Sequence, residues 1–321
     1  MYMKRYGMTI PLDGVPLLEQ REWIEELDGL GYTDLWSYEG IGLDGLTPLV
    51  LASVWAPNVR LGCAILPVYT RGPALLAMSV AALCQAAPGR FVVGLGTSSN
   101  VIVENWNGIP FQKPYQRTRD VAKFLRRALA GERVSEEYET FRVENFRLIP
   151  KLGEQPKIMI AALRQGMLRL AGRVGDGAIL NWLSADDVKQ VVPYVKEGGE
   201  GKEIVARLFV CVTSDRDEAR ERARFAINSY LNVPVYAAFH DWLGRAALLT
   251  EMWEKWESGD RKGAAAAIPD EVVDALVIHG SPAECRLHIE RYVENGVDTP
   301  VLMLLPSSMG QRQATRELAP R

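Results

Sequence analysis

The chain has few of the side chains on which hydrolases and metalloenzymes depend. Its 321 residues include three histidines and four cysteines. No C-x-x-C spacing occurs, and the pair Cys285-x-x-His288 supplies too few ligands for a metal. A G-x-S-x-G nucleophile elbow is also missing, which argues against a serine hydrolase. We therefore expect no metal site and a reaction whose chemistry is carried by an organic cofactor.

Long apolar runs and an excess of basic charge are missing as well. No stretch of about 18 apolar residues occurs, and the opening segment MYMKRYGMTIPLDG lacks the apolar core of a signal peptide. The net charge of −3 gives no electrostatic reason to bind nucleic acid. Four scattered cysteines fit reduced thiols in the cytosol. We expect a cytoplasmic protein with a small-molecule substrate and neither a membrane nor a nucleic-acid partner.

What the sequence does contain is a regular alternation of apolar strand-like runs and amphipathic helix-like stretches. Eight such runs favour a closed (β/α)8 TIM barrel of the α/β class, with an open doubly wound sheet as the alternative. We expect a single barrel domain over 1–321 with insertions at about 100–155 and 215–275. A hairpin is expected at 134–150 and two helices over 218–262. The expected strands are 8–11, 32–37, 60–67, 91–95, 157–162, 177–181, 205–212 and 300–305.

The most informative segment is RFVVGLGTSSN, residues 90–100. An apolar run stops at Gly94-Leu95-Gly96 and is followed by hydroxyl side chains, as in a buried strand whose end lines a ligand site. The third glycine of G-x-G-x-x-G is absent, and no acidic residue closes a second strand at the expected distance. A dinucleotide-binding fold is therefore excluded.

Functional residues of a barrel gather at the carboxyl ends of its strands. Trp36, Trp106 and Trp182 follow strands two, four and six, so with Asn181 they predict an aromatic substrate pocket. Packing of these indoles in the core is the alternative. Strand-end acids suited to proton transfer are Glu39 and Glu104, while His279 is expected to be packed or on the surface.

Basic residues near the strand ends suggest where an anion would bind. Arg164-Gln165-Gly166 opens a helix over 167–174, and free N–H groups at a helix start favour a phosphate. Three further cations are expected to extend a positive rim, unless they are simply solvated: Arg71, Lys113 and Arg117.

Five stretches together resemble the luciferase-like monooxygenase superfamily, and within it the actinobacterial branch of oxidoreductases that depend on the deazaflavin coenzyme F420. They are GYTDLWSYE (31–39), RLGCAILPVYTRGPALLAMS (60–79), PGRFVVGLGTSSNVIVENWNGIPFQKPYQRTRD (88–120), IAALRQGMLRLAGRVGDGAILNWLS (160–184) and HGSPAECRLHIERYVENGVDTPVL (279–302). The resemblance implies a TIM barrel, hydride transfer at C5 of the deazaflavin, and a homodimer.

The resemblance also assigns residues to the cofactor. Ring contacts would fall on Glu39 and the strand-three and strand-four ends, with a non-prolyl cis peptide at Ala64–Ile65 behind the ring. Phosphate contacts would fall on 164–167. The cofactor-binding residues implied are Ala64, Ile65, Gly96, Thr97, Ser98, Ala162, Arg164, Gln165, Gly166 and Met167.

One departure narrows the reaction. Relatives that oxidise alcohols and sugar phosphates carry a histidine directly after the strand-two acid, where this chain has Gly40. Reduction of an activated double bond or carbonyl therefore fits better, with Glu39, Glu104 or water supplying the proton. The alternatives are an FMN-dependent monooxygenase of the same superfamily and a non-catalytic flavin- or deazaflavin-binding protein. A third alternative, supported less well by the residues, is a metal-free lyase or hydrolase.

Overall fold

The computed structural model describes residues 5–320. Residues 1–4, which belong to the opening segment for which no signal peptide is expected, lie outside the described residues, as does residue 321. Nine strands form one parallel sheet, and eight of them close into a barrel in the order β1-β2-β3-β4-β7-β8-β9-β11. The TIM-barrel prediction is therefore confirmed, and each expected strand is present. The barrel strands are β1 (Gly7–Thr9), β2 (Asp34–Ser37), β3 (Arg60–Pro67), β4 (Phe91–Gly96), β7 (Lys157–Ala161), β8 (Gly177–Asn181), β9 (Glu203–Val212) and β11 (Thr299–Leu304).

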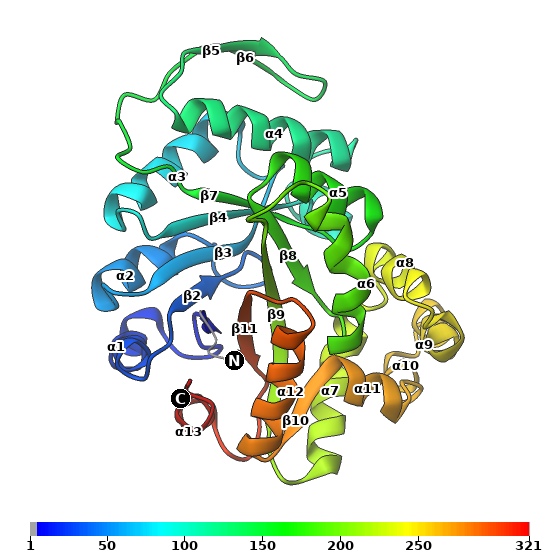
Figure 1. Ribbon diagram of the computed structural model, residues 1–321. Helices are drawn as coiled ribbons and strands as arrows, with labels where there is room; N and C mark the ends of the chain where they lie inside the picture. Colours follow the sequence, from blue (N-terminus) through cyan, green and yellow to red (C-terminus); the bar gives the residue numbers. More distant parts are fainter. Residues whose placement is uncertain (1–4, 321) are drawn as a thin grey trace.

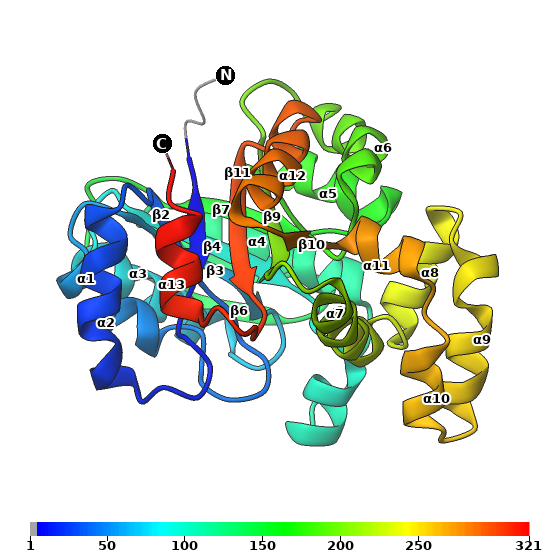
Figure 2. The ribbon, with the colours of Figure 1, turned by 90° about the horizontal axis from the view of Figure 1, so that it is seen from below.

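Helices cover the outside of the barrel, and the first and last of them lie side by side (Figures 1 and 2). Short connections alternate with these helices, as the sequence pattern predicts. None of the helices within residues 5–320 is long and apolar enough to cross a membrane. The covering helices are α1 (Arg21–Gly29), α2 (Thr47–Trp55), α3 (Pro73–Ala86), α4 (Pro114–Leu129), α5 (Gln165–Val174), α6 (Ala185–Lys196), α12 (Pro282–Glu294) and α13 (Gln311–Glu317), with a 3-10 turn at Leu17–Gln20.

Two segments interrupt the alternation where the sequence places insertions. The expected hairpin is β5 (Val134–Glu137) with β6 (Arg142–Phe146), and it lies against α4 at one edge of the molecule (Figure 1). The second segment differs from expectation, because three helices and the start of a fourth occupy the stretch 218–262, where two were expected. They are α7 (Arg216–Tyr230), α8 (Pro234–Trp242), α9 (Ala246–Glu257) and α10 (Arg261–Ala266).

A ninth strand, missed by the sequence reading, follows this helical lobe. After α11 (Asp270–Leu276), β10 (Val277–Gly280) pairs with the outer half of β9, where β8 has already ended. Within β10, the His279 Nε2 atom lies 2.9 Å from an Asp274 carboxylate oxygen. This histidine is therefore a packed one, as expected.

Side chains of alternate strand residues fill the barrel interior in layers. The layer at the amino ends is ionic and centres on Arg60, which binds Asp34 and, at 2.6 Å, Glu203. Lys157 reaches the other Glu203 oxygen at 2.7 Å. The middle layer is apolar and consists of Trp36, Val92, Met159, Ile179, Val205 and Val301. Together these two layers close the barrel from below and leave only its carboxyl end for a ligand.

Candidate functional site

The carboxyl ends of β3, β4 and β7 form a low apolar floor at the mouth of the barrel. Ala64, Ile65 and Ala161 pack on the middle layer and are only half-buried. All other residues of β3 are buried, so this strand meets solvent only at its two floor positions. Such a floor offers methyl groups and backbone to one face of a flat ligand.

Two glycines of β4 make room for an irregularity in β3. The pairing register of the two strands shifts between Cys63 and Leu66. A side chain on Gly94 would collide with the Cys63 carbonyl group, and a Cβ atom on Gly96 would lie 2.7 Å from the Ile65 side chain. The G-x-G pattern here serves strand packing, which explains why it lacks the rest of a dinucleotide fingerprint.

The residues implied for the ring side of a cofactor lie together at this mouth. The peptide bond between Ala64 and Ile65 is cis, as the resemblance implies. Thr97 and Ser98 follow Gly96 and are half-buried, and Ser98 adopts a left-handed conformation with φ of 60°. Backbone and hydroxyl groups of this loop therefore border the floor.

The start of α5 lies beside the floor and carries free donors. Arg164 is extended and exposed, and within residues 5–320 it forms no ion pair. Among the described residues, the N–H groups of Gln165, Gly166 and Met167 donate no backbone hydrogen bond, and the helix begins with Leu168 donating to the Arg164 carbonyl. A helix amino terminus with an unpaired guanidinium suits a phosphate.

Ala162 differs from the other residues that the resemblance assigns to the cofactor, because its side chain is buried. It is 2% exposed, and its N–H donates to the Ile179 carbonyl at 3.1 Å. Its side chain packs in the main core, so only its neighbours face the mouth.

The positive rim expected from three other cations is not available to a ligand. Arg71 binds the Glu39 carboxylate at 2.7 Å, and Lys113 binds Glu139 at 3.2 Å. Arg117 donates to the backbone carbonyls of Val68 and Thr140 and stacks on neighbouring rings. These charges hold the rim loops together, which leaves Arg164 as the exposed cation beside the floor.

The three-indole pocket expected from the sequence does not form. Trp36 is 1% exposed inside the barrel, where its indole N–H donates to Asp34 at 3.3 Å. Trp182 has a left-handed backbone and is 1% exposed, with its ring stacked on Phe209 at a centroid distance of 3.8 Å. Trp106 is 53% exposed on a π-helix, Val101–Trp106. Core packing, the alternative reading, describes two of the three.

The opposite side of the mouth is polar and includes Asn181. Asn181 ends β8 and lies in register with Arg207 of β9, a buried residue that the sequence reading passed over. The Asn181 amide donates to the Tyr236 hydroxyl at 2.9 Å, while its own carbonyl oxygen is buried and has no partner within residues 5–320. The sequence signal for Arg207 was a single cation in a run, 204–212, whose other residues are apolar.

The two candidate acids differ in how firmly they are held. Glu39 is bound to Arg71 and accepts the Gly45 N–H at 3.1 Å. Glu104 is exposed on the π-helix, and one of its oxygens accepts the Phe111 N–H at 3.0 Å. Glu104 thus keeps an oxygen with no protein donor among the described residues.

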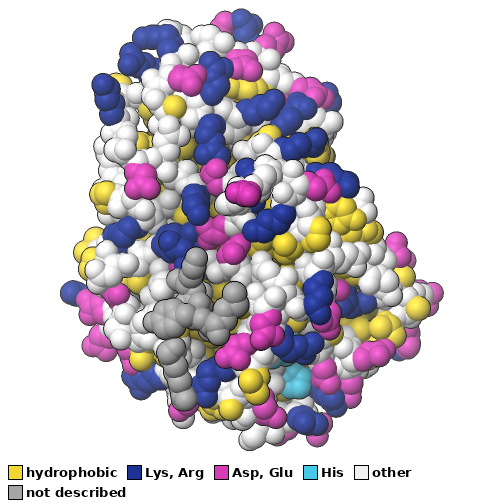
Figure 3. Space-filling view, viewed as in Figure 1, with side chains coloured by type: hydrophobic (Ala, Val, Ile, Leu, Met, Phe, Trp, Pro, Cys, Tyr) yellow, Lys and Arg dark blue, Asp and Glu magenta, His cyan; other side chains and the backbone are white. Residues whose placement is uncertain are grey.

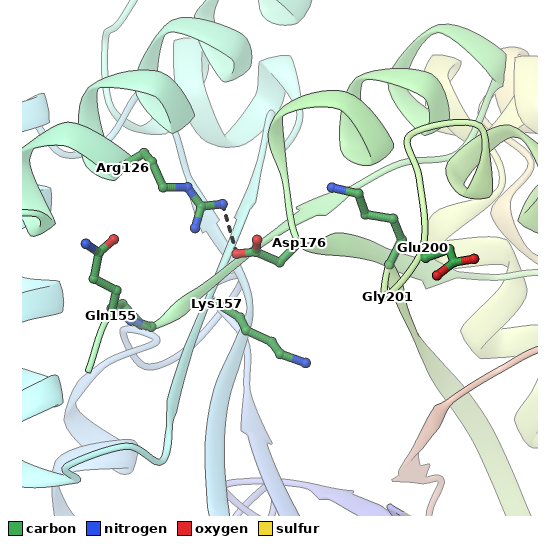
Figure 4. Close-up of a pocket in the computed structure, with 8 residues that line it drawn as sticks. Arg126, Gln155, Lys157, Asp176, Glu200 and Gly201 are labelled. Atoms are coloured by element: carbon green, nitrogen blue, oxygen red, sulfur yellow. Dashed lines mark hydrogen bonds and ion pairs between the residues drawn. The ribbon is translucent and has the colours of Figure 1, made fainter.

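A separate open cleft of about 290 Å³ lies at the other end of the barrel, between the loops that lead into β7, β8 and β9 (Figure 4). Arg126 points across it to Asp176 and binds it at 2.9 Å. Lys202 donates to the Gly175 carbonyl. Arg126 and Lys157 are paired with carboxylates here. Figure 3 shows charges of both signs interspersed over the surface in that view. The cleft holds loops together at the end of the barrel where catalytic residues do not gather.

The family model described as luciferase-like monooxygenase matches residues 5–299, nearly the whole chain. The chain belongs to this family. Among curated relatives of this luciferase-like protein is the 5,10-methylenetetrahydromethanopterin reductase of Methanolobus tindarius, 25% identical over 90% of both chains. Another is a Mycobacterium tuberculosis protein named as a coenzyme F420-dependent oxidoreductase, 26% identical over 95% of this chain and 94% of the relative.

Solved structures support the same fold for this luciferase-like chain. The coenzyme F420-dependent tetrahydromethanopterin reductase of Methanopyrus kandleri superposes with a TM-score of 0.80, over 98% of this chain and 96% of that one, at 21% identity. The resemblance drawn from the five sequence stretches is therefore confirmed at the level of family and fold.

Proposed function

We propose that this protein is an F420-dependent oxidoreductase that transfers a hydride between C5 of the deazaflavin and a small organic substrate. Curated relatives named as F420-dependent support the cofactor, and the apolar floor with the free start of α5 supports it independently. A bound deazaflavin would supply the hydride donor or acceptor. The reduction of an activated double bond or carbonyl fits best, since Gly40 occupies the position of the family's alcohol-oxidising histidine.

The observation that carries this proposal is the match between two parts of a cofactor and two parts of the mouth. A flat ring fits the apolar floor, because the side chain missing from Gly96 leaves that floor low beside Ile65. The phosphate fits the free start of α5 beside Arg164. The floor residues would fix the ring and exclude water from one of its faces. The α5 donors would hold the phosphate.

Of the two candidate acids, we assign proton transfer to Glu104. One of its carboxylate oxygens is exposed and has no donor within residues 5–320, whereas Glu39 is engaged by Arg71 and Gly45. Glu39 would then act as a positioning residue that fixes the loop after β2. Replacement of Glu104 by Gln is expected to lower kcat while leaving F420 affinity unchanged. Replacement of Glu39 by Gln is expected to weaken F420 binding and lower the Tm.

The quaternary structure and location follow as proposals. Four large apolar side chains are exposed on two adjacent helices: Val50 and Val54 of α2, and Leu75 and Met78 of α3. A second copy of the chain covering this face would remove them from water. Four free cysteines, all buried, favour a cytoplasmic location.

The first experiment is calorimetric titration of the purified protein with F420 and, separately, with FMN. Binding of F420 in the micromolar range, with weak binding of FMN, supports the proposal. Preference for FMN would instead support an oxygen-dependent monooxygenase. Tight F420 binding without turnover of any ketone, enone or imine in a broad panel would support a carrier protein. Binding of neither cofactor refutes the proposal.

A further inference from the structure

The guanidinium of Arg207 lies in the uppermost layer of the barrel interior. Along β9, Glu203 belongs to the ionic layer and Val205 to the apolar layer, so the alternation of a strand places Arg207 next above them. It is 7% exposed. The rings of Tyr38 and Phe209 lie 4.9 and 5.1 Å from its central carbon.

This buried charge has no counter-ion in the part of the chain that the structure describes. Its one hydrogen bond there goes from Nη2 to the Tyr230 hydroxyl at 3.3 Å, and its Nε atom is buried without an acceptor. Burial raises the pKa of Tyr236 to about 12, and burial followed by the charge of Asp13 raises that of Tyr38. Both phenols are therefore neutral near pH 7 and cannot balance the guanidinium.

An unpaired buried charge destabilises a fold, and its retention calls for a partner from outside the chain. The surroundings favour a carboxylate as that partner. The guanidinium fork matches a carboxylate, and its single positive charge matches a single negative one. A phosphate, with nearly two charges, would need a second cation, and Arg71 and Arg117 are already engaged elsewhere.

Two further unpaired groups occupy the same layer. The Asn181 carbonyl oxygen lies next to Arg207 across the β8–β9 pair, and the Thr9 hydroxyl lies at the end of β1. Both are buried and have no partner among the residues that the structure describes. The mouth is thus divided into an apolar half on β3, β4 and β7 and a polar half on β8, β9, β1 and the end of β2.

We propose that Arg207 and Asn181 form the substrate subsite and that the substrate carries a carboxylate, which Arg207 binds. The proposal rests on the assignment of the apolar half to the cofactor ring. A carboxylate anchored on the polar half would hold the rest of the substrate over that ring.

The test uses two small carboxylates of different size as probes, sodium acetate and sodium benzoate. The Nε–H signal of Arg207 is followed by 1H–15N NMR and assigned by its loss in Arg207→Lys. A saturable shift with either carboxylate, and none with acetamide, benzamide or matched sodium chloride, is the expected result. If neither carboxylate gives a saturable shift, or if the amides shift the signal equally, the proposal is overturned.

Calorimetry on Arg207→Met gives a second readout that does not depend on NMR. We expect roughly tenfold or more weaker carboxylate binding, as for loss of a charge-assisted pair. The Tm should be equal or higher, because an unpaired buried charge is removed, and F420 affinity should be unchanged. Loss of F420 binding in this variant would assign Arg207 to the cofactor instead. Failure of the wild-type protein to bind F420 would refute the proposed function and leave the carboxylate titration as a separate result.

Discussion

The carbonyl oxygen of Cys63 lies 2.0 Å from the point that a Cβ atom on Gly94 would occupy. The atom in the way belongs to the backbone of the neighbouring strand and cannot rotate aside as the end of a side chain can. The fit between β3 and β4, and therefore the shape of the floor, depends on the absence of one methyl group.

Gly94→Ala should destabilise the protein by about 3 kcal/mol, the upper end of the usual cost of overpacking. Urea unfolding measures the change. The matched control is Gly166→Ala in α5, where a Cβ atom meets nothing within 4 Å. That variant should be as stable as the wild type or slightly more stable, because an alanine in the first turn of a helix loses less backbone entropy than a glycine. Equal stability of Gly94→Ala and wild type would contradict the packing assigned to this strand pair.

The ionic layer predicts a loss of stability in acid. Burial alone would raise the pKa of Glu203, but hydrogen bonds and charge from Arg60, and then Lys157, outweigh it and lower the pKa from 4.5 to about 2. Because the pKa is lower in the folded state, the stabilisation is complete above about pH 4.5 and is lost as the pH falls towards 2. The contribution is roughly 3 kcal/mol.

Urea unfolding at a series of pH values tests this loss. In Glu203→Gln the free energy of unfolding should lack the contribution of Glu203 to its fall between pH 4.5 and 2. Glu144→Gln removes a carboxylate from an exposed surface pair and should show the same fall as the wild type. If the free energy of unfolding fell equally in wild type and Glu203→Gln between pH 4.5 and 2, other carboxylates would be responsible for the acid sensitivity.

Arg164→Ala should weaken F420 binding about tenfold or more, since a hydrogen bond to a charged group contributes about 1.5–3 kcal/mol. Its Tm should not change, because Arg164 is exposed and unpaired within residues 5–320. Calorimetric titration at two salt concentrations measures the effect, which should shrink at high salt. Arg169→Ala, on the same helix but paired with Glu197, is the control and should bind F420 normally. Equal affinities of both variants would remove Arg164 from the phosphate site.

Val54→Glu should convert the proposed dimer into a monomer, because it places a charge in the middle of the exposed apolar face of α2 and α3. Light scattering after size exclusion reports the mass. Leu287→Glu, at an isolated exposed leucine of α12, should leave the mass unchanged. A wild-type mass of one chain would refute the dimer.

The strand pattern was readable from the sequence because parallel strands buried on both faces are short, apolar and bounded by turns. The extra strand β10 was missed because Val277 and Ile278 follow directly on the apolar end of α11, and no turn residue separates them. The helical lobe was read too coarsely for a similar reason. Its breaks at Asn232 and Gly244 lie between stretches of the same amphipathic character.

The site was harder to predict than the fold. Position after a strand shows that a residue is near the mouth but not which way its side chain points. Trp36 lies within β2 and is buried in the middle layer, and Trp182 has a left-handed backbone and stacks on Phe209. Arg207 carried a usable signal, a lone cation at an inward position of an apolar strand. Its lack of a partner depends on contacts between distant strands, which no local pattern contains.

The layout of the mouth along the chain affects how the protein can change. The floor and the α5 start come from one continuous third of the sequence, 64–167, while Asn181, Arg207 and Tyr236 lie beyond it. Mutation or recombination in the later segment can therefore replace Asn181, Arg207 and Tyr236 without touching the apolar half. A barrel arranged in this way can acquire new substrates while its redox chemistry is inherited intact.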